Sequence, residues 1–350
     1  MFEVTTIGSA TFDIFLKNFS CRTLKESSFT TKKGLCLSLG SKISVGDISW
    51  SSGGGAINTA ISFAKLGLKT SAIFSFGKDI FSQKIKEDLT KVKVDFSLAY
   101  LKENFEPPIS VILSLPSGER TILHAKRRPN LSISFLKKLK TKWLYLAPLA
   151  GEGTSLDDKY LLEKIIQKTK EKNFFLASNP SLKDLEIYRK KKKLLNFFDV
   201  FILNQEEASY LTKIPFNKER EIFRKLDDLV EGIIVMTKGK RGVVVSNGYY
   251  LFSASIFPNK KIVDRTGAGD SFAAAFIAGL IKIGAKNSQE LKRKIIENPS
   301  LLKEPIRLAS ANATSVVESI GAHQGALTYE EFKKNKRWQN LKIEIKKISH

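Results

Sequence analysis

Short apolar runs alternate with amphipathic stretches over most of the chain. Continuous apolar runs predict buried strands, and apolar positions three and four residues apart predict helices. Strands are predicted at residues 4–8, 70–76, 142–147, 174–177, 200–203, 232–236 and 242–246, and helices at 57–66, 157–172, 206–211, 271–283 and 306–319. This alternation favours an α/β fold with a mostly parallel sheet covered by helices on both faces.

Two regions depart from this alternation. Residues 34–47 have an apolar pattern of period two with no helix after it, and residues 108–126 hold two apolar runs around a Pro-Ser-Gly turn. Both predict antiparallel strands with one exposed face. We expect a small sheet, built from lid segments of about residues 12–50 and 97–126, that covers a cleft of the main domain.

The composition is typical of a globular protein, with 350 residues, 42% hydrophobic and 27% charged. The first residues lack a basic stretch followed by an apolar block, and Cys21 and Cys36 are too few for a disulfide framework. No apolar run approaches the roughly 20 residues that span a bilayer. We therefore expect a cytoplasmic protein without a membrane partner.

The formal net charge of +23 raises the possibility of a nucleic-acid partner. The lysines are scattered, with local clusters at residues 189–193 and 333–337, which is more typical of solvated faces than of a groove. Nucleic acid is therefore the less favoured partner, whereas a basic protein favours anionic substrates such as nucleotide phosphates. Residues 331–350 are set apart as a basic C-terminal segment.

The stretch DRTGAGDSFAAAFIAGL, residues 264–280, carries the clearest chemistry. Gly267, Ala268 and Gly269 precede a predicted helix, whose first N–H groups are unpaired and lie at the positive end of its dipole. Residues without bulky side chains let a phosphate contact this backbone. Asp270 could then accept the proton of a substrate hydroxyl while the amides stabilise a transferring phosphoryl group. A capped helix would explain Asp270 but not the small residues before it.

Other common nucleotide and metal motifs are absent from the sequence. There is no GxxxxGK[ST] loop and no GxGxxG after a predicted strand. The histidines, His124, His323 and His350, are too few and too dispersed to predict a metal cluster.

The stretch Asp264-Arg-Thr-Gly-Ala-Gly-Asp270 resembles the C-terminal signature of the PfkB family of carbohydrate and nucleoside kinases. Residues 52–67, SGGGAINTAISFAKLG, are similar to its N-terminal signature with the GGxxxN core. Further matches follow in the family's order: Gly8 to Asp13, Asn204-Gln-Glu-Glu207, Thr237-Lys-Gly239 with Gly242, and Asn312 with Gly321-Ala322. The resemblance spans about residues 3–330. It implies one kinase domain, residues 1–330, with a ribokinase-like three-layer α/β/α fold, a mostly parallel central sheet and a small antiparallel β lid.

The resemblance also implies roles for single residues. Asp270 would be the catalytic base, and Gly267, Ala268 and Gly269 would form the anion hole. Asp13, Gly53, Gly54 and Asn58 would bind the acceptor, and Asn204, Thr237, Gly239, Gly242 and Asn312 would bind the nucleotide. Glu207 would orient Mg²⁺ through water, and Asp264 and Thr266 match the monovalent-cation (K⁺) loop of some members.

Plainer roles remain open for several of these residues. Asn58 could cap a helix, Asn204 and Glu207 could form an exposed polar helix start, and residues 237–239 could form a simple β-turn. Arg265 stands where the family often has Thr, which puts the cation site in doubt. Gly55 replaces the Lys of ribokinase, which disfavours ribose. The basic stretch 124–128 could contact an anionic acceptor or be solvated.

These observations favour an enzyme that transfers the γ-phosphoryl of ATP, with Mg²⁺, to a hydroxyl of a sugar, sugar phosphate or nucleoside. The lid would exclude water during transfer, and exposed lid sheets could pair two copies into a homodimer. One alternative is a kinase specific for adenosine or another nucleoside, whose base would stack on Phe12, Phe15 or Phe105. Another is a non-catalytic sugar- or nucleic-acid-binding module.

Overall fold

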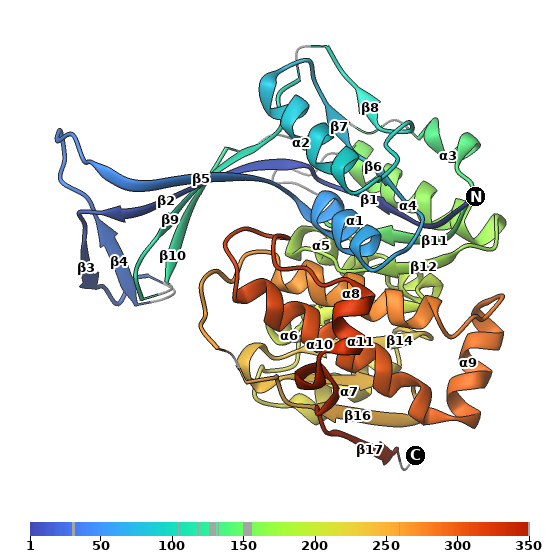
Figure 1. Ribbon diagram of the computed structural model, residues 1–350. Coiled ribbons are helices and arrows are strands. Elements are labelled where there is room, and N and C mark those ends of the chain that lie inside the picture. The colour runs from blue at the N-terminus through green and yellow to red at the C-terminus, as the bar shows by residue number, and fades with distance from the viewer. Residues whose placement is uncertain are drawn as a thin grey trace.

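The computed structural model describes residues 1–29, 32–103, 105–117, 119–125, 131, 133–149, 156–258 and 260–348. In this part of the chain the main sheet has nine strands in the order β17-β16-β15-β14-β13-β12-β11-β1-β6 (Figure 1). Its strands are β1 (Phe2–Ile7), β6 (Thr70–Ile73), β11 (Thr141–Leu146), β12 (Phe175–Ser178), β13 (Val200–Asn204), β14 (Ile233–Thr237), β15 (Val243–Ser246), β16 (Tyr250–Ala254) and β17 (Ile343–Lys347). The strands β6, β1, β11, β12, β13 and β14 pair in parallel, in this order. Strands β15, β16 and β17 follow β14 and pair antiparallel. The predicted mostly parallel sheet is confirmed.

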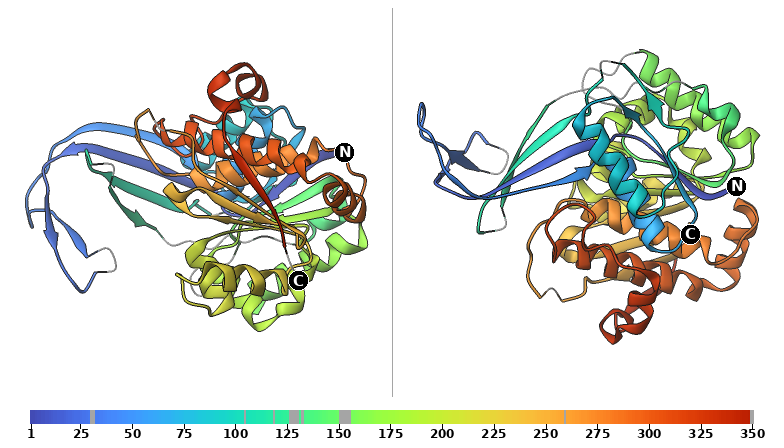
Figure 2. Two further views of the ribbon diagram at one scale, coloured as in Figure 1. Left: turned by 90° about the horizontal axis from the view of Figure 1, so that it is seen from below. Right: turned by 45° about the horizontal axis from the view of Figure 1, so that its top comes forward.

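Helices cover both faces of this sheet (Figures 1 and 2). The helices are α1 (Gly55–Lys65), α2 (Ile80–Lys91), α3 (Phe135–Lys138), α4 (Leu156–Glu171), α5 (Leu182–Lys190), α6 (Gln205–Thr212), α7 (Glu219–Asp227), α8 (Ala268–Ile281), α9 (Ser288–Glu297), α10 (Lys303–Val317) and α11 (Tyr329–Lys334), with 3₁₀ turns at Lys192–Phe197, Gly239–Arg241, Pro299–Leu302 and Lys336–Gln339. Helices α1, α8, α10 and α11 share one apolar core with the sheet, and α4, α5, α6 and α7 share another. The result is the expected three-layer α/β/α arrangement.

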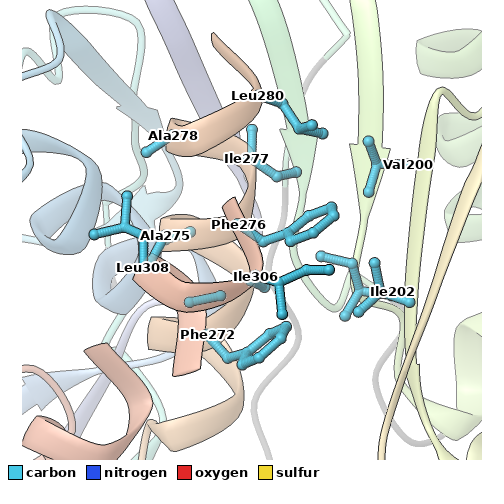
Figure 3. Packing of buried hydrophobic residues seen from close by; sticks show 14 of the residues in the cluster. Val200, Ile202, Phe272, Ala275, Phe276, Ile277, Ala278, Leu280, Ile306 and Leu308 are labelled. Carbon is cyan, nitrogen blue, oxygen red and sulfur yellow. The ribbon is translucent and has the colours of Figure 1, made fainter. Parts of the chain in front are cut away.

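Helix α8 is buried along nearly its whole length, and this fixes the residues at its start. Phe272 and Phe276 point toward Val200 and Ile202 of β13 (Figure 3). On another side of the helix, a Cβ on Gly279 would lie 2.6 Å from the Cα of Pro305, so α10 packs closely there. A rigid, apolar helix of this kind holds its first turn in one place relative to the sheet.

A second sheet projects from the body as an arm (Figures 1 and 2). It contains β2 (Thr11–Phe19), β5 (Val45–Gly53), β9 (Ile109–Ser114) and β10 (Arg120–His124), in the order β10-β9-β2-β5. We call these four strands the lid sheet. The hairpin of β3 (Arg22–Lys25) and β4 (Lys33–Cys36) lies at its far end, and β7 (Ser75–Phe76) pairs with β8 (Tyr100–Leu101) at the body. The pairs β2–β5 and β9–β10 are antiparallel as expected, while β2 and β9 join them in parallel.

The C-terminal residues belong to the main body, which corrects the boundary predicted at residue 330. Strand β17 pairs with β16 along the edge of the main sheet. Phe332, Trp338 and Ile343 are buried in the same core as α8 and α10. This packing was not predicted, because lysines and arginine between the apolar residues make the segment look like a solvated surface. No helix within the described ranges is long and apolar enough to cross a membrane.

Candidate active site

The predicted base lies where two helices from distant parts of the sequence begin. Asp270 is half-buried in the first turn of α8, and the amide nitrogen of Asn58, near the start of α1, donates to its Oδ2 at 2.8 Å. The pKa of Asp270 is raised to about 6. Burial is the largest cause and the charge of Asp13 adds to it, while the hydrogen bond from Asn58 acts in the opposite direction. At neutral pH the group is mostly ionised, which suits it to accept a proton.

The glycines before Asp270 differ in what they do. Gly267 has φ +73°, and a Cβ there would lie 2.0 Å from the carbonyl oxygen of Ala322, so this position needs glycine for the backbone itself. A Cβ on Gly269 would meet nothing within 4 Å. The amides of residues 268–270 precede Ser271, whose N–H donates to the Gly267 carbonyl at 2.8 Å. They belong to the first turn, where N–H groups lack intrahelical acceptors, and Gly269 leaves open space in front of them.

The predicted acceptor residues meet at the base of the lid sheet. Asp13 of β2 is buried, and the Thr11 hydroxyl donates to its Oδ1 at 3.1 Å. Burial raises the pKa of Asp13, while hydrogen bonds from Ser110 and Thr11 lower it. A Cβ on Gly53 would lie 2.2 Å from the Asp13 carboxylate. Gly54, at φ +90°, similarly has no room for a side chain beside the Ser9 carbonyl. Glycine at position 53 therefore lets the backbone approach the Asp13 carboxylate, and glycine at position 54 lets it approach the backbone of Ser9.

Asn58 lies inside α1 rather than at its cap, which is Gly54. The side chain is buried and has a second partner, His323, whose Nδ1 is 3.4 Å from the Asn58 Oδ1. Burial lowers the pKa of His323 to about 4, so its imidazole is neutral near pH 7. A neutral ring protonated at Nδ1 donates to the amide oxygen, which turns the amide NH₂ toward Asp270. No local pattern in the sequence indicates this contact, because the two residues are 265 positions apart.

Tyr145 is a second residue near the base that sequence reasoning missed. It lies on β11, is fully buried, and its hydroxyl has no hydrogen-bond partner within the described residues. Burial raises its pKa well above the usual value, and the negative charge of Asp270 adds to this effect. Its phenol therefore stays neutral beside the carboxylate.

On the nucleotide side, Asn204 and Glu207 form a capping box at the start of α6. The Glu207 N–H donates to Asn204 Oδ1 at 2.9 Å, and the Asn204 N–H donates to Glu207 Oε2 at 2.8 Å. Asn204 and Glu207 therefore do form the polar helix start that was considered as the plainer alternative to a nucleotide site. Burial, the largest cause, raises the pKa of Glu207 to about 7, and neighbouring Glu206 adds to it.

The residues described here fit Mg²⁺ only if phosphates supply most of its ligands. No group of three or more His, Cys, Asp or Glu side chains that could hold a metal occurs in the described ranges. Glu207 uses Oε2 in the cap, which leaves Oε1. One carboxylate together with phosphates and water is an arrangement that Mg²⁺ accepts.

The remaining nucleotide candidates lie at a turn after β14. Gly239 has φ +56°, and a Cβ there would meet nothing within 4 Å, so the turn is open on that side. Gly242, at φ +88°, has the Ala254 carbonyl 2.0 Å from where a Cβ would lie. Thr237 donates to the Leu203 carbonyl at 3.4 Å. The space beside Gly239 is therefore where this turn can admit a ligand.

Asn312 is placed differently from the other candidates. It has no exposed surface; its amide nitrogen donates to the Ser271 carbonyl at 3.0 Å, and its oxygen accepts the Leu327 N–H at 2.7 Å. The side chain therefore ties α8 to the segment after α10. A direct contact with a nucleotide has no support in this geometry.

The loop predicted for a monovalent cation is already well bonded. Asp264 is buried, and its Oδ1 accepts the N–H and the hydroxyl of Thr266 at 2.9 and 2.7 Å. Its Oδ2 accepts the Gly321 N–H at 3.3 Å, and Nη1 of Arg120, from the lid sheet, lies 3.5 Å from Oδ1. Of the basic stretch 124–128, residues 126–128 lie outside the described residues.

The phenylalanines considered for base stacking pack into the protein. Phe12 is 6% exposed with its ring centroid 4.9 Å from that of Phe81, and Phe15 and Phe105 are 1% and 9% exposed. They leave no open aromatic slot at these positions.

Comparison with known proteins decides the family. Residues 30–328 match the model of the pfkB family carbohydrate kinases. The chain belongs to this family. It is a phosphotransferase that uses a hydroxyl acceptor, of the class that phosphorylates sugars or nucleosides.

The relatives include kinases for both kinds of acceptor. The chain is 24% identical to a probable fructokinase-5 of Arabidopsis thaliana over 74% of this chain and 80% of that protein. The crystal structure of the Methanocaldococcus jannaschii nucleoside kinase superposes with a TM-score of 0.71 at 20% identity, covering 97% of this chain and 98% of that chain. The Arabidopsis thaliana ribokinase, complexed with ribose and ATP, also gives 0.71 at 20% identity, covering 95% and 98%. These structures show the fold and leave the acceptor open.

Proposed function

We propose that this kinase transfers the γ-phosphoryl group of ATP to a hydroxyl of a sugar, sugar phosphate or nucleoside, with Asp270 as the base. The observation that carries the proposal is the position of Asp270. A half-buried carboxylate whose pKa is about 6 lies in the first turn of α8, beside the helix-start amides, and is oriented by Asn58. A pure binding protein gains nothing from an ionised base next to an anion site.

One group of residues would bind the acceptor and activate its hydroxyl, and another would bind ATP. Asp13, Asn58 and the backbone at residues 53–54 would bind acceptor hydroxyls and hold one of them against Asp270. Asp270 takes the proton of that hydroxyl while the hydroxyl oxygen attacks the γ-phosphorus. The bond from this phosphorus to the bridging oxygen of ATP breaks, and ADP leaves. The amides of residues 268–270, at the start of α8, stabilise negative charge on the transferring group.

The donor would lie over the open turn at residues 237–242, near the start of α6. Asn204 would face its phosphates, and Glu207 would orient water around a Mg²⁺ ion carried by the nucleotide. That ion would neutralise phosphate charge during transfer. Because Glu207 has a pKa of about 7, its ionised form, and hence its usefulness to Mg²⁺, declines below neutral pH.

The test is ADP formation by the purified protein with ATP, Mg²⁺ and a panel of sugars, sugar phosphates and nucleosides. We expect acceptor-dependent turnover that the Asp270→Asn variant loses. Asp228→Asn is the matched control, since Asp228 is an exposed carboxylate at the end of α7. Turnover unchanged in Asp270→Asn would remove the base from its role, and no turnover with any acceptor would favour a binding module.

We also propose that the lid sheet pairs with a second copy of the chain. Trp50, Ile14, Val111 and Leu123 form one cross-strand row, and Trp50 and Leu123 are 62% and 57% exposed. Exposed apolar rows on a sheet typically mark an interaction surface. Light scattering should give a dimer mass for the native chain and a monomer for Trp50→Glu. A monomeric native chain would contradict this proposal.

A further inference from the structure

Asp264 carries a charge that its immediate neighbours do not balance. Its side chain is 4% exposed, and the hydrogen bonds from Thr266 and Gly321 come from uncharged groups. A buried carboxylate with only neutral donors is costly unless a positive charge lies nearby. In many proteins a bound metal ion or an arginine supplies that charge.

In this protein the nearest cation comes from the lid. Arg120 begins β10, and its Nη1 lies 3.5 Å from Asp264 Oδ1 with the side chain 29% exposed. The contact joins residues 144 positions apart, so it connects the lid sheet to the loop that enters α8. The carboxylate end of the pair is shielded from water while the guanidinium end is partly exposed, so the attraction is stronger than between two fully exposed charges.

A monovalent cation does not fit beside Asp264 while Arg120 is in place. Both carboxylate oxygens already accept hydrogen bonds, and Oδ1 faces the guanidinium. A second positive charge at this distance would be repelled by the first. The loop therefore departs from the K⁺ site that the sequence resemblance implied.

We propose that Arg120 replaces the monovalent cation, so that closure of the lid supplies the charge that orders the anion-hole loop. Asp264 holds Thr266 and Gly321 through its oxygens, and Gly267 packs directly on Ala322. Ordering Asp264 thus orders the backbone whose next amides would face the phosphoryl group. Arg120 is a positioning residue that acts through Asp264. The inference rests on the proposed kinase function.

The first test compares salts at equal ionic strength, using an acceptor that turns over in the panel. The native enzyme should have the same kcat in KCl and in tetramethylammonium chloride. Arg120→Gln should lose activity on the order of tenfold in tetramethylammonium chloride, because lid and loop are uncoupled. KCl should restore much of it, because the small cation can then reach Asp264. Arg22→Gln, on exposed strand β3, is the matched control and should behave as the native enzyme.

The second test needs no turnover and so separates this inference from the proposed function. Thermal unfolding of the ligand-free chain should show a lower Tm for Arg120→Gln in tetramethylammonium chloride, with recovery in KCl. The native chain and Arg22→Gln should have the same Tm in both salts. These results would support charge replacement even if no acceptor were phosphorylated.

Three results would overturn the inference. One is activation of the native enzyme by K⁺ of about fivefold or more, within the range of ordinary allosteric coupling. Another is an Arg120→Gln variant that matches Arg22→Gln in both tests. The third is a rise in the KM for the acceptor in Arg120→Gln that KCl does not reverse. This result would mean that Arg120 binds the acceptor and does not act through Asp264.

Discussion

Two aspartates at the two ends of one short loop have opposite surroundings. Asp264 is buried, and its oxygens accept three hydrogen bonds and face a guanidinium. Asp270, six residues later, is half-buried and has a hydrogen bond from Asn58. The Asp264 carboxylate is fixed by its hydrogen bonds and by Arg120. The Asp270 carboxylate has fewer partners and can still accept a proton. A loop that holds one acid rigidly can present the other in a defined place.

Replacing each acid by its amide should separate these roles most strongly. Asp270→Asn should lower kcat on the order of a thousandfold, because the amide cannot accept the proton. Asp264→Asn should lower kcat far less, on the order of tenfold, through loss of loop order. Steady-state ADP formation with saturating acceptor measures both. Equal losses in the two variants would mean that Asp270 acts only by holding the loop.

The same two variants should move the free energy of unfolding in opposite directions. The folded-state pKa of Asp270 is about 6, above its unfolded value of 3.8, so its ionisation opposes folding at pH 7. Asp270→Asn should therefore stabilise the chain by about 1–3 kcal/mol at pH 7, and the gain should fade as pH drops from 6 to 4. Asp264→Asn should destabilise it by a similar amount, because Arg120 loses its partner. Urea unfolding at pH 7 and pH 4 measures both changes.

The glycines of the loop offer a second pair. Gly267→Ala should destabilise the chain by about 1–3 kcal/mol, since the residue has positive φ and faces the Ala322 carbonyl. Gly269→Ala should leave stability within about 0.5 kcal/mol, because its Cβ meets nothing. It should instead raise the KM for ATP or lower kcat by filling the open space. A Gly269→Ala enzyme with native kinetics would show that no phosphate approaches there.

The loop also shows how far sequence reasoning reaches. The order of the motifs predicted the fold family, and it predicted roles for Asp270, Asn58, Asp13 and residues 267–269. The structure brings Asn58 against Asp270, and the roles themselves stay predictions. Long-range partners were not predictable, because His323 and Arg120 reach the site from elements far away in the sequence. Asn312 was assigned to the nucleotide because a motif shows which residue is present, not which way its side chain is bonded.

The pH dependence of kcat should sharpen the view of Asp270. Activity should fall as pH drops through about 6, the pKa of the base. Asp13→Asn should move this midpoint lower, because it removes a negative charge that raises the pKa of Asp270. Asn58→Leu should move it higher, because the hydrogen bond that favours the ionised carboxylate is lost. Midpoints that stay fixed in both variants would assign the acid limb to another group.

The smallest expected effect concerns the residue behind Asn58. His323→Phe should lower kcat/KM about fivefold, since it removes one hydrogen bond, with a net value of about 1 kcal/mol, that orients the Asn58 amide. His323→Gln can still donate to the amide oxygen and should recover most of the loss. The acid limb should shift upward in His323→Phe and return in His323→Gln, a change that mere loss of packing would not produce. Native pH profiles in both variants would show that α1 alone orients Asn58, and Asp270 would then owe its alignment to backbone geometry.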